Sequence, residues 1–248
     1  MPRALVTGSN KGVGLGLCQV LAERGDDVLA ACRSSSPELE ALGVTVLEGV
    51  DLAEPSSGDR LREAVGDGPI DLVAANAGSN LAFHNERPED FDLELFQVDL
   101  AVNLVGAART VLSALPNMAA GSRVMLVSSG ASRPGLNVPG SFGYKITKAA
   151  LNQYGRLLAT ELAPRGIVVA IVTPGPTNSD LNWRYYNEGI SKQLPSELRS
   201  PAESARRMIE LTEAVTLETS GTFWDHAGNV LLRPDGTPPR SGTAEAGR

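Results

Sequence analysis

Tyr144 and Lys148 are the residues of this chain whose types and spacing point most directly to acid–base chemistry. They stand four apart in SFGYKITKAALNQYGRLL (141–158), a stretch with the pattern of a long helix. Residues i and i+4 of a helix share one face, one turn apart. A tyrosine has a pKa of about 10, and a neighbouring ammonium group stabilises its phenolate. Such pairs also occur by chance on helices, so the rest of the chain decides their meaning.

A glycine-rich loop, TGSNKGVG (7–14), follows the first apolar run and opens into a helical pattern. Gly8, Gly12 and Gly14 permit positive φ and let the backbone approach a pyrophosphate, while the free N–H groups of a helix start favour an anion. Strand, loop and helix in this order predict a dinucleotide site. The alternative is that the glycines serve only a tight turn.

The end of the second apolar run bears on which dinucleotide binds. An acidic residue there would bind the ribose 2′-hydroxyl of NAD. The sequence instead reads ACRSSS, with Arg33 and Ser34 and no carboxylate. Lys11 in the glycine loop can reach the same region, and two cations suit a phosphate monoester. NADP(H) is therefore favoured over NAD(H), unless Arg33 and Lys11 are only solvated surface residues.

Short apolar runs alternate with longer helical patterns, and the runs lack the polar alternation of half-exposed strands. This order predicts right-handed βαβ crossovers and a Rossmann-type α/β fold, a doubly wound, mostly parallel seven-stranded sheet with helices on both faces. The longest helical patterns are 88–115 and 142–163. The seven predicted strands are 4–7, 27–32, 44–49, 70–75, 123–129, 167–173 and 222–225.

One catalytic domain is expected over 1–232. Within it, 180–200 carries Trp183, Tyr185 and Tyr186 in a protein that is only 4% aromatic, so this segment is either a solvated loop or a substrate lid with an aromatic lining. Residues 233–248 are rich in Pro, Gly and Thr, which predicts a mobile tail.

Composition argues against several functions. The net charge of −7, without a basic run, disfavours nucleic acid. Cys18 and Cys32 lie in apolar runs and are expected to be buried thiols of a reducing compartment, while His84 and His226 are too isolated for a metal site. The first apolar run begins at residue 4, and no stretch approaches about 20 apolar residues, so we expect a cytoplasmic protein without a leader or membrane span.

Six motifs, in order, resemble the classical short-chain dehydrogenase/reductase family. They are the glycine loop, NAG at 76–78, the Asn of VNLVG, the SS that ends the fifth strand, YKITK at 144–148 and PG at 174–175. The resemblance extends to about residue 230. The KG of the glycine loop, the CR that ends the second strand and FWDHAG near the C-terminus resemble the carbonyl-reductase and C-factor-like branch.

The resemblance implies an oxidoreductase that transfers hydride between NADP(H) and a carbonyl or alcohol, with Tyr144 as general acid or base. Lys148 would lower the Tyr144 pKa and bond the nicotinamide ribose, and Ser129 would polarise the substrate carbonyl. Asn103 would mark a helix distortion that holds a water linked to Lys148. The implied cofactor contacts are Gly8, Asn10, Lys11, Gly12, Val13, Gly14, Arg33, Ser34, Asp51, Leu52, Asn76, Ala77, Gly78, Tyr144, Lys148, Pro174, Gly175, Thr177 and Ser179.

The stretch from Ser129 to Tyr144 is longer than is usual in the family, which makes Ser128, Ser132 and Ser141 rivals for the catalytic serine. Ser129 is preferred because RVMLVSS aligns with the family's strand without a gap.

Ketone or aldehyde reduction by NADPH is the main hypothesis, with a small-molecule substrate as partner. One alternative is a catalytically silent NADP(H)-binding regulatory or signalling protein. Another is an epimerase or dehydratase of the extended relatives, which the short chain and the glycine spacing disfavour. By resemblance, 88–115 and 142–163 would form a subunit contact, which implies a homodimer or homotetramer.

Overall fold

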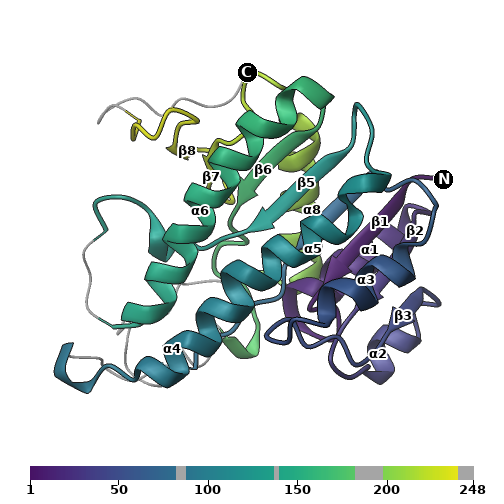
Figure 1. Ribbon diagram of the computed structural model, residues 1–248, viewed down its shortest axis with the longest axis horizontal. Helices are drawn as coiled ribbons and strands as arrows, with labels where there is room; N and C mark the ends of the chain where they lie inside the picture. Colours follow the sequence, from purple (N-terminus) through teal and green to yellow (C-terminus); the bar gives the residue numbers. More distant parts are fainter. Residues whose placement is uncertain (82–87, 137–139, 182–197, 240–248) are drawn as a thin grey trace.

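The computed structural model describes residues 1–81, 88–136, 140–181 and 198–239, which form one sheet between two layers of helices (Figure 1). Strands within these ranges pair in the order β3-β2-β1-β4-β5-β6-β7-β8, parallel except for the antiparallel β7–β8 pair. The strands are β1 Arg3–Thr7, β2 Asp27–Ala31, β3 Thr45–Leu47, β4 Leu72–Ala75, β5 Arg123–Val127, β6 Val168–Val172, β7 Phe223–Trp224 and β8 Val230–Leu232.

The predicted fold class is confirmed, but the predicted count of seven strands is wrong. The eighth strand is the three-residue run VLL at 230–232. It was missed because so short a run directly before a Pro- and Gly-rich segment carries no periodicity.

Both faces of the sheet are covered, which is why its strands lack polar alternation. One apolar cluster contains Leu17 of α1 and Met208 of α8, and the other contains Leu61 of α3, Val111 of α5 and Leu151 of α6. Figure 1 shows α3, α5 and α6 on the near face and α1 and α8 behind the sheet. The α-helices of the described ranges are α1 Gly12–Glu23, α2 Pro37–Glu40, α3 Ser57–Val65, α4 Leu93–Leu100, α5 Ala107–Ala114, α6 Phe142–Leu162 and α8 Pro201–Ala214.

The long helix predicted over 88–115 is interrupted. A π-helical turn, Ala101–Gly106, separates α4 from α5 and contains Asn103. π-helical turns are rare in proteins, and those that do occur often lie at functional sites. The helix predicted over 142–163 is found as α6, which a short 3₁₀ turn and Gly166 in the left-handed region bring to an end.

The segment Leu93–Asn117 has the length and mean hydropathy (1.4) of a membrane span, contrary to the expectation that no stretch approaches one. However, 44% of its most apolar window is buried inside the protein. Because α5 packs against α3 and β4, the α5 part of this segment has the contacts of a core helix.

Two predicted regions fall largely outside the described residues. Of the predicted lid, 182–197 lies outside them, and so do Trp183, Tyr185 and Tyr186. Of the predicted tail, 240–248 lies outside. In the part of the tail that is described, Pro234 O accepts a hydrogen bond from Arg156 Nε of α6 at 2.9 Å.

Candidate active site

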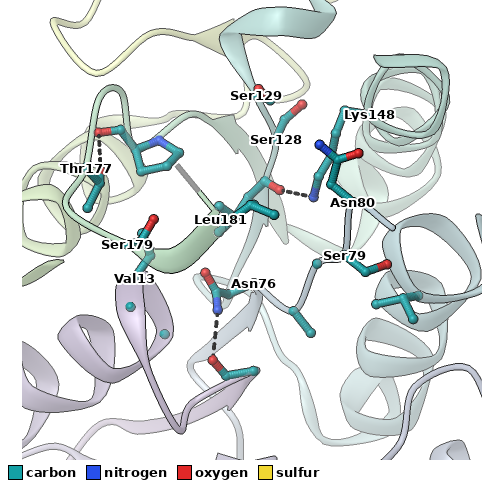
Figure 2. A pocket seen from close by; sticks show the side chains of 18 of the residues that line it. Val13, Asn76, Ser79, Asn80, Ser128, Ser129, Lys148, Thr177, Ser179 and Leu181 are labelled. Carbon is teal, nitrogen blue, oxygen red and sulfur yellow. Dashed lines mark hydrogen bonds between the residues drawn. The ribbon is translucent and has the colours of Figure 1, made fainter. Parts of the chain in front are cut away.

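A cavity of about 940 Å³ lies at the carboxyl ends of the central strands (Figure 2). The sheet order changes direction between β1 and β4, and ligands of doubly wound sheets bind at such a switch point. All the predicted cofactor residues line this cavity except Ser34, which is exposed next to Arg33. Predicted cofactor residues that are as far apart in the sequence as Gly8 and Ser179 thus line one cavity.

The glycine loop presents a free helix start to this cavity. Helix α1 begins at Gly12, and its N-cap residue, Lys11, makes no side-chain capping bond. Asn76 holds the loop in place, since its Nδ2 lies 3.0 Å from Thr7 O and 3.3 Å from Gly8 O (Figure 2). A Cβ at Gly14 would lie only 2.0 Å from Gly8 O, so the turn requires glycine there. The uncapped N–H groups and helix dipole fit a pyrophosphate.

Two cationic side chains line the cavity, Lys11 of the glycine loop and Arg33 after β2. Arg33 is exposed and lines the cavity, as the sequence predicts for a 2′-phosphate contact. Lys11 Nζ lies 2.7 Å from Asp180 Oδ2, so Lys11 forms an ion pair with a residue at the start of the predicted lid. Asp51 Oδ1 accepts a hydrogen bond from Ala53 N at 3.0 Å, a bond that fixes the carboxylate at the edge of the cavity.

Tyr144 and Lys148 lie together on the first turns of α6. The Lys148 Nζ atom is 5.9 Å from the centre of the Tyr144 ring and donates a hydrogen bond to Val127 O at 2.9 Å. Lys148 is buried and Tyr144 half-buried, and both line the cavity. The pair is therefore not an exposed surface pair: its two side chains face the predicted cofactor site.

Burial shifts the pKa values of both groups. It raises the pKa of Tyr144 to about 12, an effect that a hydrogen bond with Ser129 opposes and the charge of Asp99 reinforces. Burial lowers the pKa of Lys148 to about 8, and Asp99 acts against this change. In the chain alone, loss of solvation outweighs the Ser129 hydrogen bond; the lowering expected from Lys148 together with the nicotinamide charge stays a prediction.

Ser129 is the serine whose side chain interacts with Tyr144. The rivals have other partners: Ser128 Oγ donates to Asn152 Oδ1 at 2.5 Å, and Ser132 Oγ donates to Ser129 O at 2.7 Å. Ser141 is buried before Tyr144, with its Oγ 3.4 Å from Asn80 Nδ2. Despite the longer spacing in the sequence, the Ser129 side chain interacts with Tyr144.

Asn103 lies behind the cavity wall and does not line the cavity. Its Oδ1 accepts from Ser79 N at 2.8 Å, and its Nδ2 donates to Ser79 O at 2.8 Å and to Thr147 Oγ1 at 2.9 Å. One turn earlier, the buried Asp99 accepts hydrogen bonds from Ser79 Oγ at 2.6 Å and from Leu81 N at 2.9 Å. The π-helical turn and α4 therefore hold the segment after β4 against the cavity.

The loop after β6 forms the opposite wall. Gly175 has φ +70°, and a Cβ there would lie 2.5 Å from the ring of His226, so only glycine admits this imidazole. The Thr177 Oγ1 donates to Gly175 O at 3.1 Å and is 2.8 Å from Ser204 Oγ of α8. The Thr177 hydroxyl thus holds the loop in shape.

Sequence reasoning missed Asp99, Asn152, Asn80 and His226. Signals existed for two of them: Asp99 is a carboxylate in an apolar helical run, four residues before Asn103, and Asn152 follows Lys148 by four. Asn80 and His226 lie in irregular segments, where spacing does not predict orientation.

A doubly wound sheet with a cavity at its switch point is the architecture of dinucleotide-binding proteins. The family described as short chain dehydrogenase matches residues 2–189. The chain belongs to this family, the short-chain dehydrogenase/reductase oxidoreductases, as the order of its motifs predicts.

Individual relatives agree with this assignment. The 1-hydroxy-2-glutathionyl-2-methyl-3-butene dehydrogenase of Rhodococcus sp. (strain AD45) is 30% identical over 234 residues, 93% of this chain and 99% of that protein. The angucycline C-6 ketoreductase LanV with bound NADP has a TM-score of 0.77 at 26% identity, covering 91% of this chain and 93% of that one. The NADPH-bound carbonyl reductase from chicken fatty liver has a TM-score of 0.79 at 20% identity, covering 93% and 98%, which shows a shared fold.

Proposed function

We propose that this protein is an NADPH-dependent reductase of ketones or aldehydes, with Tyr144 as the general acid. One observation carries the proposal: Tyr144, Lys148 and Ser129 line the same cavity as the uncapped start of α1 and the exposed Arg33. Related proteins support it, because one is named as a dehydrogenase and another, with NADP bound, as a ketoreductase. Both names describe chemistry between an alcohol and a carbonyl.

The residues fit the cofactor in three places. The N-terminus of α1 would hold the pyrophosphate, Arg33 and Lys11 the 2′-phosphate, and the Lys148 ammonium the nicotinamide ribose. Lys11 would exchange its contact with Asp180 for the phosphate. Bound NADPH would supply the hydride.

Side chains of this protein would supply the proton that the reduction requires. Ser129 would donate a hydrogen bond to the substrate carbonyl and keep its oxygen beside Tyr144. The raised pKa of Tyr144 keeps this side chain protonated at neutral pH, so that it can protonate an alkoxide formed by hydride addition. Lys148, with a pKa of about 8, would remain mostly charged at pH 7 and limit the cost of the phenolate left behind. A protonated Tyr144 is the form that the reductive direction starts from.

Tyr144→Phe tests the assignment, because it removes only the acidic hydroxyl. We expect NADPH binding, measured by nucleotide fluorescence, to be unchanged. Turnover of a ketone panel should fall at least about a hundredfold, as for loss of a general acid. Normal turnover in the variant would refute the role of Tyr144. Cofactor binding by the wild-type protein without any turnover would instead support the regulatory alternative.

We also infer that the protein self-associates through α4, α5 and α6; α6 packs against α4 and against the π-helical turn that leads into α5 (Figure 1). Large apolar side chains are exposed along these helices and the intervening π-helical turn. They are Leu93, Leu95, Val98, Val105, Leu112, Phe142, Ile146 and Leu157. Large apolar side chains exposed on neighbouring helices are typical of a protein–protein interface, which supports a homodimer or homotetramer.

A further inference from the structure

Asn80 is a buried amide on the wall of the cavity, and one of its polar atoms has no hydrogen-bond partner among the described residues. Its side chain is 3% exposed and lines the cavity between Ser79 and Leu81. The Nδ2 atom lies 3.4 Å from Ser141 Oγ, whereas no donor within the described ranges bonds to Oδ1. Unpartnered buried polar atoms are rare in native proteins, so this one requires an explanation.

The residues on either side of Asn80 are held rigidly. Asn103 bonds both the N–H and the C=O of Ser79, each at 2.8 Å. The Leu81 N–H donates to the carboxylate of Asp99 at 2.9 Å. Asn80 therefore lies on a segment fixed on both sides, which presents its amide in one place.

That place is close to the proposed acid. The amide contacts Ser141, which immediately precedes α6 and stands three residues, or about one helical turn (roughly 5 Å of rise), before Tyr144. In Figure 2 the Asn80 side chain lies in the same part of the cavity as Ser79 and Lys148. Asn80 and Tyr144 line the same cavity, so both can contact one bound molecule.

A purely structural role does not account for this amide. The contact with Ser141 is long for a hydrogen bond and occupies one of the two polar atoms of the amide. Rotating the amide by 180° would exchange its oxygen and nitrogen, and one of them would still lack a partner. A hydroxyl group suits either orientation, because it both donates and accepts.

We propose that Asn80 recognises a hydroxyl group on the substrate, one or two carbons from the reacting carbonyl. The inference rests on the proposed carbonyl reduction and names its substrate class as α- or β-hydroxy ketones. It also assigns Asn80 as a residue that determines specificity, since a substrate without the hydroxyl would leave the buried amide unpartnered when it binds.

The test compares matched ketones. With NADPH, kcat/KM is measured for 1-hydroxy-2-butanone, 4-hydroxy-2-butanone and 2-butanone, in the wild type and in Asn80→Leu, whose side chain has a similar size. We expect the wild type to prefer at least one hydroxy ketone over 2-butanone. In N80L this preference should fall by about tenfold or more. The preference is the ratio of kcat/KM for a hydroxy ketone to kcat/KM for 2-butanone. Because this ratio is compared between the wild type and the variant, differences in the intrinsic reactivity of the ketones cancel.

Two further variants separate recognition from structure. Ser141→Ala removes the protein partner of Asn80 and should leave the hydroxyl preference in place. Asn80→Ser retains a hydrogen-bonding group and should have an intermediate preference, which provides the comparison if N80L does not bind NADPH. The same preference in the wild type, N80L and N80S would overturn the inference, and so would a loss in S141A equal to that in N80L.

The same measurements distinguish failure of the role of Asn80 from failure of the proposed carbonyl reduction. Reduction of all three ketones with a preference unaffected by Asn80 would overturn the role of Asn80 and leave carbonyl reduction standing. No turnover of any ketone by the wild type would count against carbonyl reduction itself, and the assignment of Asn80 would fall with it.

Discussion

Ser128 donates a hydrogen bond to the side-chain oxygen of Asn152 at 2.5 Å, which joins the end of β5 to α6 one turn beyond Lys148. The same amide donates from Nδ2 to Ser132 Oγ at 3.0 Å. Ser132 in turn donates to the Ser129 carbonyl oxygen at 2.7 Å. Asn152 is buried, so these bonds are shielded from water. The serine loop is thus attached to the helix that carries the Tyr–Lys pair.

Asn152→Ala should therefore reduce kcat by about tenfold, because a small displacement of Ser129 weakens its contact with the substrate carbonyl. NADPH affinity should be unchanged, since Asn152 does not line the cavity. Gln153→Ala, one residue along on the exposed side of α6, is the matched control. Steady-state kinetics of both variants provide the measurement, and an unaltered kcat in N152A would contradict the positioning role.

Asp99→Asn should shift the pH–rate profile to lower pH. The Asp99 carboxylate raises the pKa of Tyr144 and that of Lys148, so loss of its charge lowers both. Alcohol oxidation needs the phenolate, and its rising limb should move to lower pH. Reduction needs the charged form of Lys148. The rate of reduction should therefore fall near pH 8 in the wild type and at a lower pH in the variant.

Ser79→Ala is the control for this prediction. It removes one hydrogen bond to Asp99 but leaves the charge in place. Its pH profile should match that of the wild type. A shift in S79A equal to that in D99N would assign the effect to local structure and not to charge.

Arg33→Ala should raise the KM for NADPH by about tenfold or more and leave the KM for NADH nearly unchanged. The reason is that a guanidinium–phosphate contact is available only to the 2′-phosphate. Arg62→Ala removes an exposed arginine outside the cavity and controls for net charge. Equal effects of R33A on the two cofactors would refute the assignment of Arg33.

Leu157→Asp or Leu112→Asp should dissociate the proposed oligomer, because a buried, unpaired carboxylate at an apolar interface is unfavourable. The two leucines, on α6 and α5, are 59% and 52% exposed. Leu217→Asp is a control of similar exposure (50%) away from these helices. Light scattering at micromolar concentration measures the mass, and a wild-type monomer would refute self-association through this surface.

Local sequence was sufficient for much of the fold. The apolar runs predicted seven of the eight strands, and the glycine loop predicted the start of α1, because these features depend on burial on both faces and on backbone freedom near one residue. The four-residue spacing put Tyr144 and Lys148 on one helical face, which the geometry of a helix guarantees.

Contacts between distant segments required the tertiary structure. Which serine interacts with Tyr144 depends on how the loop after β5 packs on Asn152, and the raised Tyr144 pKa depends on burial together with Asp99, 45 residues earlier in the chain. Residue types and spacing in the sequence by themselves determined the family, the sheet and the candidate chemistry. Only folding decided the solvation, charge and partners of each side chain, because these properties depend on neighbours that are remote in sequence.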